Sequence, residues 1–326
     1  YIIAIILIFS LYTCEKEPGA NPLPEWEIYN RDEKGPSASF FTSLYINKHG
    51  LWAGTKNEGV FLNSSDTWYQ FDSTGIYLNG NSVRFISSYG NLMHVGIKNK
   101  GVSRFYFNDL DAITGETILD QEYDEISSLN VFSMFLDDNM DQWYGTDVGI
   151  SHHTGEFWKI NWNSYTVENG LSDNNINNIC QDPSKVIWAG TKNGLSFFEG
   201  SRWKNIPELE GLTIYKQVFN HSDHKLWCAT DSGSFQISKE NNSYSTKKYI
   251  SPLVNDEAVH VVYYDPANSE IILGMKGAIL LVNNKGERMM EFPSGYEESI
   301  CNDILTDPEG SLWIATSEAL LKLPDN

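Results

Sequence analysis

One short motif returns seven times along the chain and constrains the fold more than any other feature. Each copy has a large side chain, usually Trp, followed two residues later by Gly or Ala and then usually by Thr. Successive copies are 39 to 49 residues apart, a period typical of solenoids and β-propellers. The copies are Trp52–Thr55, His94–Ile97, Trp143–Thr146, Trp188–Thr191, Trp227–Thr230, Ile272–Met275 and Trp313–Thr316.

Each period predicts four short strands. In the unit that starts at residue 165, the β-rich runs NINNICQD, VIWAGT and LSFFEG are separated by the turn segments PSK and KNG, and RWKNI follows. Four strands in each repeat make a propeller blade. No convincing helical periodicity interrupts the units. We therefore predict an all-β fold, a seven-bladed β-propeller of four-stranded blades.

The repeated residues have structural roles that explain their recurrence. A Trp on the second strand can fill the space between twisted neighbouring blades. Gly or Ala two positions later allows close approach of a neighbour. Asn193 and Gly194 supply the positive φ angles that a tight hairpin requires. We interpret these positions as scaffold.

The two ends of the chain predict how the ring closes. The last copy, in LWIATSEALLKLPDN, provides a second and a third strand and then stops. The segment PEWEIYN, residues 24 to 30, has the pattern of a fourth strand. We expect Trp26 to Tyr29 to complete the seventh blade, because an open seam would expose sheet edges. The propeller then covers residues 25–326.

The segment before the propeller has the features of an export signal. The apolar run from Tyr1 to Leu11 is shorter than the about 20 residues of a membrane span, but fits a secretory signal. A starting Met and a basic segment are missing, so we expect the natural chain to begin earlier. The following LYTC resembles a lipobox and predicts a signal segment 1–14, lipidation at Cys14 and a flexible tether 15–24. The expected location is the cell envelope, lipid-anchored at the outer membrane; an uncleaved N-terminal anchor is the alternative.

Two repeats resemble a known family. Residues 165–200, YTVENGLSDNNINNICQDPSKVIWAGTKNGLSFFEG, and residues 299–321 resemble the two-component regulator propeller repeat, which runs through Gly-Leu-Ser, Asn, Asp and Leu-Trp-Ile-Gly-Thr. In that family the propellers are often extracytoplasmic sensor modules of bacterial hybrid histidine kinases, many linked to glycan sensing. The resemblance implies the fold and ligand binding. One propeller takes up these 326 residues, so we expect a separate partner to supply any signalling.

Charge and cysteine content narrow the classes of partner. The chain has 43 acidic and 23 basic residues and a formal net charge of −20, which would repel a phosphate backbone. We therefore expect no nucleic-acid partner. Cys180, Cys228 and Cys301 fit neither a disulfide framework nor a zinc motif, and we predict small buried apolar residues there.

Several motifs that could bind metal are better explained as turns or strands. Asp137–Asp141 begins like a calcium loop but lacks the Gly and Glu required at the sixth and twelfth positions. His221 and His224 occupy the equivalent turn of the fifth unit. His152 and His153 should point to opposite faces of a strand. We predict no metal site and no cofactor.

The channel mouth is where we expect a ligand. Turns between second and third strands would place Lys-Asn pairs around the axis, where they could hold carboxylate or hydroxyl groups of an acidic sugar. Solvated hairpin residues are the alternative. The candidates in these turns are Lys56, Asn57, Lys98, Asn99, Asp147, Lys192, Asn193, Asp231 and Lys276.

Two aromatic residues complete the candidate site. Trp162 and Tyr165 are assigned to a connection from a fourth strand to the next first strand, where their rings could stack on a sugar; inter-blade packing is the alternative. Together these features predict a non-catalytic ligand-binding or sensory lipoprotein that recognises a glycan fragment or a partner protein. A propeller-fold polysaccharide lyase or glycoside hydrolase is the alternative, although no Ser-His-Asp order or nucleophile elbow is visible.

Overall fold

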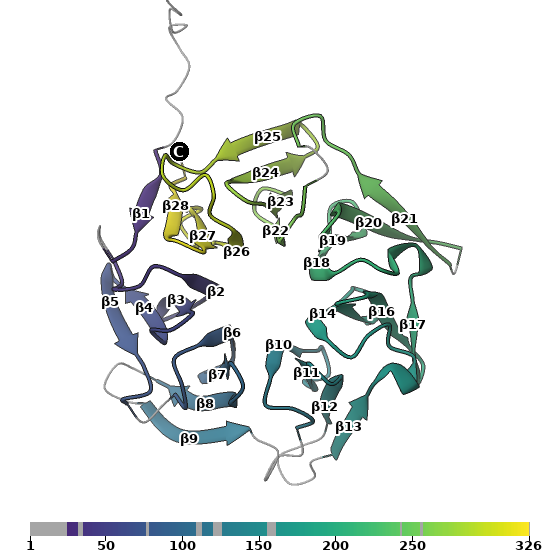
Figure 1. Ribbon diagram of the computed structural model, residues 1–326, viewed down its shortest axis with the longest axis horizontal. Coiled ribbons are helices and arrows are strands. Elements are labelled where there is room, and N and C mark those ends of the chain that lie inside the picture. The colour runs from purple at the N-terminus through teal and green to yellow at the C-terminus, as the bar shows by residue number, and fades with distance from the viewer. Residues whose placement is uncertain are drawn as a thin grey trace, which may run out of the picture.

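The structure, a computed structural model, describes most of the predicted propeller. The described residues are 25–31, 35–75, 78–108, 113–119, 126–154, 161–241, 243–254 and 257–325. They form seven four-stranded antiparallel sheets that stand as blades around a central axis (Figure 1). The predicted seven-bladed, all-β propeller is confirmed. Cys14, the predicted signal segment and the predicted tether lie outside the described residues.

Each of the first three blades runs from an inner strand near the axis to an outer strand at the rim (Figure 1). Blade 1 consists of β2 (Phe41–Asn47), β3 (Gly50–Thr55), β4 (Val60–Ser64) and β5 (Thr67–Phe71). Blade 2 consists of β6 (Val83–Tyr89), β7 (Leu92–Ile97), β8 (Gly101–Phe107) and β9 (Ile113–Leu119). Blade 3 consists of β10 (Val131–Leu136), β11 (Gln142–Thr146), β12 (Ile150–Thr154) and β13 (Asn161–Tyr165).

The next three blades have the same order of strands. Blade 4 consists of β14 (Ile176–Gln181), β15 (Ile187–Thr191), β16 (Gly194–Glu199) and β17 (Arg202–Asn205). Blade 5 consists of β18 (Ile214–Asn220), β19 (Lys225–Thr230), β20 (Gly233–Glu240) and β21 (Ser243–Tyr249). Blade 6 consists of β22 (Val261–Asp265), β23 (Glu270–Gly274), β24 (Ala278–Asn283) and β25 (Gly286–Glu291). The 3₁₀ helices η1 (Val167–Asn169) and η2 (Pro207–Leu209) lie in the connections after β13 and β17.

The seventh blade joins the two ends of the chain. It consists of β26 (Cys301–Thr306), β27 (Leu312–Thr316), β28 (Leu320–Leu323) and β1 (Glu27–Tyr29). β1 pairs antiparallel with β28, so that Ile28 lies opposite Leu321. The ring of Tyr29 packs against Trp313 in this blade, at 5.1 Å between centroids, and against Trp68 in blade 1, at 6.1 Å. The predicted closure of the ring by the N-terminal strand is confirmed.

The repeated motif is explained by packing. Trp188 is 1% exposed, and its indole N–H donates to Asp182 in the preceding turn at 3.0 Å. At Gly190 an added Cβ would lie 2.8 Å from the Ile214 side chain of the next blade, so the position has no room for a larger residue. Thr191 Oγ1 donates to the carbonyl oxygen of Gly194 at 2.8 Å and fastens the hairpin. The motif is therefore scaffold, as predicted.

The three cysteines of the described residues differ in burial. Within the described residues, Cys180, Cys228 and Cys301 are free thiols. Cys228 and Cys301 are buried, as predicted, whereas Cys180 is partly exposed. In the described part of the chain, no helix has the length and apolar character needed to cross a membrane.

Candidate functional site

A β-bulge recurs on the inner strands and shapes the channel mouth. In six of the seven inner strands of the described blades, one residue near the start of the strand is skipped in the pairing with the second strand of the same blade. A bulge bends the strand and re-aims the extra side chain, which leaves the alternating pattern. The skipped residues are Thr42, Arg84, Phe132, Asn177, Tyr215 and Asn302.

The bulged side chains reach the neighbouring blade. Asn177 Nδ2 donates to the carbonyl oxygen of Ile214 at 2.9 Å, and Asn302 Nδ2 donates to that of Phe41 at 2.7 Å. The Arg84 guanidinium lies over the Phe132 ring, 4.9 Å from its centre. The bulges therefore form a belt of polar and aromatic contacts around the start of the channel.

The predicted turn residues lie beside this belt. The backbone N–H of Lys56 donates to Phe40 at 3.1 Å, and that of Lys98 donates to Ser82 at 2.8 Å. The N–H of Lys192 makes the equivalent bond to a carbonyl oxygen just before β14, at 3.0 Å. Each turn after a second strand is thus fixed to the start of its own inner strand, which brings these lysines to one face of the ring.

Two of the predicted lysines line one cavity, to which blades 1, 2 and 7 contribute residues. Its volume is about 310 Å³, within the range of small-molecule sites. Three of its lining residues, Lys56, Lys98 and Arg84, are cationic, and none of its lining residues is acidic. The lining residues are Phe40, Thr42, Lys56, Ser82, Val83, Arg84, Lys98 and Asn302. We call this the cationic pocket.

Arg84 is the most enclosed charge in the cationic pocket. Burial lowers the pKa of its guanidinium, although an arginine remains protonated at any physiological pH. Its Nε is buried and has no hydrogen-bond partner among the described residues, and the same holds for the hydroxyl of Thr42. The Lys56 ammonium lies 4.6 Å from the centre of the Phe40 ring. The pocket therefore presents cationic side chains to an anion, and its wall holds two buried donors without a hydrogen bond among the described residues.

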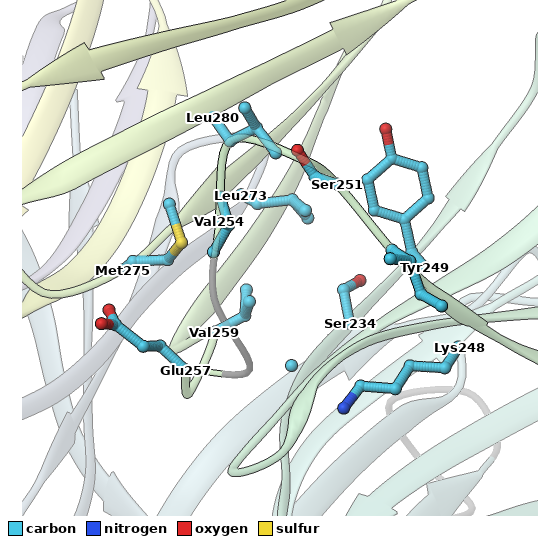
Figure 2. Close-up of a pocket in the computed structure, with 12 residues that line it drawn as sticks. Ser234, Lys248, Tyr249, Ser251, Val254, Glu257, Val259, Leu273, Met275 and Leu280 are labelled. Atoms are coloured by element: carbon cyan, nitrogen blue, oxygen red, sulfur yellow. The ribbon is translucent and has the colours of Figure 1, made fainter.

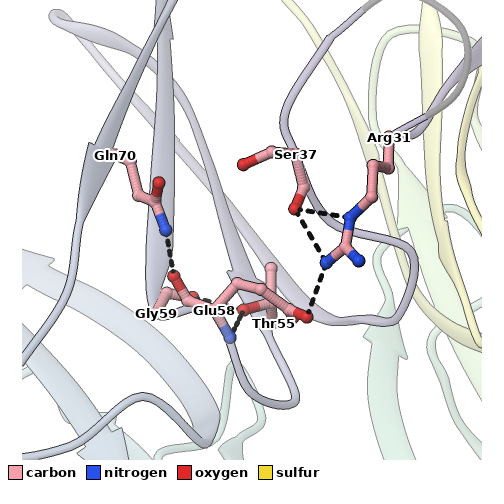
Figure 3. A network of polar contacts seen from close by, with 6 residues as sticks. All are labelled: Arg31, Ser37, Thr55, Glu58, Gly59 and Gln70. Atoms are coloured by element: carbon pink, nitrogen blue, oxygen red, sulfur yellow. Dashed lines mark hydrogen bonds and ion pairs between the residues drawn. The ribbon is translucent and has the colours of Figure 1, made fainter.

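The nearest acidic side chain in the Lys56 turn is turned to another partner. Glu58 Oε1 accepts from Arg31 at 3.3 Å, and Arg31 also donates to the carbonyl oxygen of Ser37 (Figure 3). The Glu58 backbone is held at both ends, by Thr55 Oγ1 at 2.9 Å and by the Gln70 side chain at 2.9 Å. Arg31 follows the closing strand β1, so closure of the ring places it beside Glu58. Glu58 therefore pairs with Arg31 and not with Lys56, which lines the pocket.

Other predicted candidates take part in the turns themselves. Asp147 accepts from Asn130 at 3.2 Å, and Asn193 accepts the backbone N–H of Gly211 at 2.9 Å. Asp231 accepts the backbone N–H of Thr213 at 3.2 Å. These three side chains lie on the predicted face, where they hold turns to neighbouring connections.

The remaining turn candidates differ in exposure and pairing. Asn99 has a φ of 59°, a left-handed turn conformation, and Asn57 and Lys192 are exposed. Lys276 forms an ion pair with Glu298, and this bond raises the pKa of the lysine. The structure therefore does not bring these four residues into the cationic pocket.

The two predicted aromatic residues lie elsewhere, and the assignment of their segment was wrong. Residues 161–165 form the outer strand β13, and the connection to blade 4 begins only at Thr166. Trp162 packs against His153 at 4.9 Å and Tyr165 against Phe198 at 5.3 Å. The error arose because Trp and Tyr among polar residues also fit an exposed outer strand, where every second residue is solvated.

Sequence reasoning missed six of the eight residues that line the cationic pocket, and for three of them, Thr42, Arg84 and Asn302, the structure gives a shared cause. Each of these three is a bulged residue. In a regular strand its side chain would point to one face of the sheet, and only the bulge turns it toward the pocket. A weak signal was available, since the same strand position holds polar residues in several repeats. The bulge itself depends on strand pairing and cannot be recognised from the pattern.

Other cavities are less suited to an anion. Cavities of about 320 and 420 Å³ lie at the opposite ends of the strands, and both mix acidic and basic side chains. A cavity between blades 5 and 6, lined by Leu273, Met275 and Leu280 among others, is shown in Figure 2. Its volume is only about 40 Å³, room for a water molecule or two. Charge therefore selects the cationic pocket.

The motifs predicted to be structural are turns and strands. Asp137–Asp141 lies in the connection between β10 and β11, and His221 and His224 lie in the equivalent connection of blade 5. His152 stacks on Trp143 and His153 contacts Trp162, so the two rings lie on opposite faces of β12. The predicted placement of these residues, in turns and on opposite faces of a strand, is confirmed.

Comparison with known structures supports the fold. The chain is similar to the extracellular domains of two hybrid two-component systems from B. thetaiotaomicron, with TM-scores of 0.75 and 0.74 and identities of 18% and 19%. These similarities cover 93% of this chain but only 40% and 41% of those chains. A catalytically inactive virginiamycin B lyase from Staphylococcus aureus, solved with quinupristin, has a TM-score of 0.67 at 14% identity, covering 93% of this chain and 99% of that one. At such identities the similarity shows the fold alone.

The comparison of sequences is more specific. No curated protein matches the chain. Residues 170–193, from the turn before β14 to the hairpin after β15, match the family model of the two-component regulator propeller. This match confirms, for one repeat of the chain, the resemblance to the two-component regulator propeller that the sequence predicted.

Proposed function

We propose that the protein is a non-catalytic, ligand-binding sensory propeller of the bacterial cell envelope that binds an acidic glycan fragment in the cationic pocket. The observation that carries this proposal is the convergence of Lys56, Lys98 and Arg84 on one cavity with no acidic lining residue. The chain as a whole has a net charge of −20, so such a cationic surface is not a consequence of composition.

The chemistry of the pocket suits a carboxylate or sulfate on a sugar. Arginine and lysine donate charge-assisted hydrogen bonds to such anions. Because Arg84 is partly buried, its charge acts in a lower effective dielectric than water and attracts an anion more strongly. The polar side chains of Thr42, Ser82 and Asn302 can contact sugar hydroxyls, and the Phe40 ring offers an apolar face. The volume of about 310 Å³ fits one terminal sugar unit rather than a long chain.

Location in the envelope and attachment by a lipid at Cys14 are part of the proposal. They are supported by the export-signal pattern before the propeller and by two of the similar structures, which are extracellular domains of two-component systems. A separate signalling partner would then read the bound state.

The test is binding of short acidic oligosaccharides to the purified protein by isothermal titration calorimetry. A uronate trimer and a sulfated disaccharide separate carboxylate from sulfate recognition, and a neutral trimer is the reference. We expect Lys98→Gln to weaken binding of the acidic ligand by about 10-fold, which corresponds to the loss of one charge-assisted hydrogen bond. Arg84→Gln should weaken binding by more. The matched control is Lys192→Gln, which removes the same charge from the same turn of blade 4, outside the pocket.

Three outcomes would overturn the proposal. The first is no binding of any acidic oligosaccharide, and the second is equal loss in the Lys98 and Lys192 variants. The third is release of unsaturated or hydrolysed product that depends on Arg84, which would make the protein a lyase or hydrolase. Binding of an acidic peptide in place of the sugars would assign the pocket to a partner protein.

A further inference from the structure

The turn between the first and second strands of blade 3 is built like the same turn in blade 4. Asp137 Oδ1 accepts the backbone N–H groups of Asn139 and Asp141 at 2.8 and 3.0 Å, and Oδ2 accepts the indole N–H of Trp143 at 2.9 Å. Asp182 makes the three equivalent bonds in blade 4 at 2.8, 3.1 and 3.0 Å. These bonds are therefore the scaffold of the turn and do not distinguish blade 3.

Blade 3 differs from its counterparts at two positions of this turn region. One position follows the turn Asp by four residues, and the other lies opposite the repeated Trp on the third strand. In blade 3 these positions hold Asp141 and His152. In blades 4 and 7 they hold Val186 and Phe197, and Ser311 and Lys322.

The two residues that are particular to blade 3, Asp141 and His152, lie close to Asp137, so that three metal-ligating groups come together. One ligand atom each of Asp137, Asp141 and His152 lie within 4.8 Å of one another. His152 Nε2 is 3.6 Å from Asp141 Oδ2. Donor atoms of a tetrahedral Zn²⁺ site lie roughly 3.4 Å apart, so this pair already has a suitable separation.

His152 supplies an independent indication of a ligand. Its side chain is only 9% exposed, and its ring stacks on Trp143 with 3.5 Å between centroids and 12° between planes. Neither ring nitrogen has a hydrogen-bond partner among the described residues. A buried imidazole without hydrogen bonds is costly, and a metal ion that accepts the lone pair of one ring nitrogen reduces that cost.

We propose that Asp137, Asp141 and His152 form a binding site for a divalent transition-metal ion such as Zn²⁺. One imidazole and two carboxylates match the ligands that Zn²⁺ prefers, and water or an external ligand completes the coordination. The indole N–H of Trp143 and the backbone N–H groups of Asn139 and Asp141 act as outer-shell donors that orient the Asp137 carboxylate. Asp141 is 25% exposed, which leaves a route for the ion from solvent. The site lies at the opposite end of the strands from the cationic pocket and is independent of it.

The test replaces the proposed ligands by the residues that another blade of the propeller has at the same positions. His152→Phe and Asp141→Val install the residues that blade 4 carries at the same positions, so both variants should keep the fold. Chelator-treated protein is titrated with ZnCl₂ by calorimetry, and its melting temperature is measured with and without Zn²⁺. We expect one Zn²⁺ for each chain, a melting temperature raised by the metal, and at least roughly tenfold weaker binding in each variant. Co²⁺ in place of Zn²⁺ should give the visible absorption of a tetrahedral site.

Controls place the ion at this site and not on exposed histidines. His221→Gln and His224→Gln, in the equivalent turn of blade 5, should leave Zn²⁺ binding unchanged. Circular dichroism of the metal-free variants checks that their fold is intact. Absence of stoichiometric binding, or binding unchanged in His152→Phe and Asp141→Val but lost in the blade 5 variants, would overturn the proposal.

Discussion

Lys216 and Asp303 form an ion pair between two blades that are not neighbours. Lys216 lies on β18 of blade 5 and Asp303 on β26 of blade 7, and Lys216 Nζ is 2.5 Å from Asp303 Oδ1. Asp303 Oδ2 also accepts the backbone N–H of Leu44 in blade 1, at 2.8 Å. The Asp303 carboxylate therefore links blades 1, 5 and 7 at the channel, although blade 6 lies between blades 5 and 7 in the ring.

This arrangement predicts unequal effects of removing the two partners. Asp303→Ala should lower the free energy of unfolding by about 2–3 kcal/mol, because it leaves a backbone N–H and a partly buried ammonium without a partner. Lys216→Met should cost only about 1 kcal/mol, since the Lys216 side chain is 30% exposed. Urea unfolding measures both. As a control, Glu199→Gln breaks the exposed pair with Lys204 and should change stability by less than about 1 kcal/mol. Equal costs for the two channel variants would contradict this account.

The small residue after each repeated Trp should not tolerate enlargement where the next blade packs against it. Gly190→Ala would place a Cβ 2.4 Å from Gln217 Oε1 and 2.8 Å from Ile214 Cγ2. We expect a loss of about 1–3 kcal/mol of unfolding free energy from overpacking. The reverse change at the matching position of blade 5, Ala229→Gly, should cost only about 0.5–1 kcal/mol. If chemical unfolding showed Gly190→Ala to be neutral, the close approach of blades 4 and 5 would not be what requires glycine.

Closure of the ring should depend on Tyr29, which packs against both Trp313 and Trp68. Tyr29→Ala removes an aromatic contact on each side of the seam and should lower stability by about 2–4 kcal/mol. Thermal unfolding followed by circular dichroism measures the change. Tyr106, which is 44% exposed on β8, provides the control, because its replacement by Ala should change stability by no more than about 0.5 kcal/mol. Similar melting temperatures for the two variants would show that the seam does not limit stability.

His94 should make the propeller sensitive to acid. It occupies the repeated Trp position of blade 2, is 1% exposed, and burial, aided by the charge of Arg104, lowers its pKa to about 3. The unfolded chain binds a proton there below about pH 6.5, whereas the folded protein does not until about pH 3. Stability is therefore lost as pH falls through this window, by about 1.4 kcal/mol per pH unit.

The measurement for His94 is the unfolding free energy at pH 7 and pH 5. Between these values His94→Leu should lose about 2 kcal/mol less stability than the unsubstituted protein. Replacing exposed His221 by Gln should leave the acid sensitivity unchanged. Parallel pH curves for His94→Leu and the unsubstituted protein would exclude His94 as the source.

Much of the fold could be predicted because the repeated motif answers a packing problem that occurs seven times. A Trp that fills the inter-blade space and a Gly that admits the next blade are needed in nearly every unit, so the period of 39 to 49 residues is visible in the chain. The closure by Trp26 to Tyr29 could be predicted for a similar reason, since an incomplete last blade requires an outer strand from elsewhere. The Lys56 and Lys98 turns were predictable because they follow the motif at fixed distances.

The tertiary structure alone decided which of these residues meet. Arg84 and Asn302 reach the cationic pocket through bulges, and a bulge depends on how two strands pair rather than on one strand's pattern. Trp162 could not be placed from sequence, because an outer strand and a solvated connection have similar composition. Lys216 and Asp303 lie 87 residues apart and meet because ring closure fixes the angle between their blades. A local pattern records what each blade needs for its own packing, whereas a site shared between blades exists only once the ring has closed.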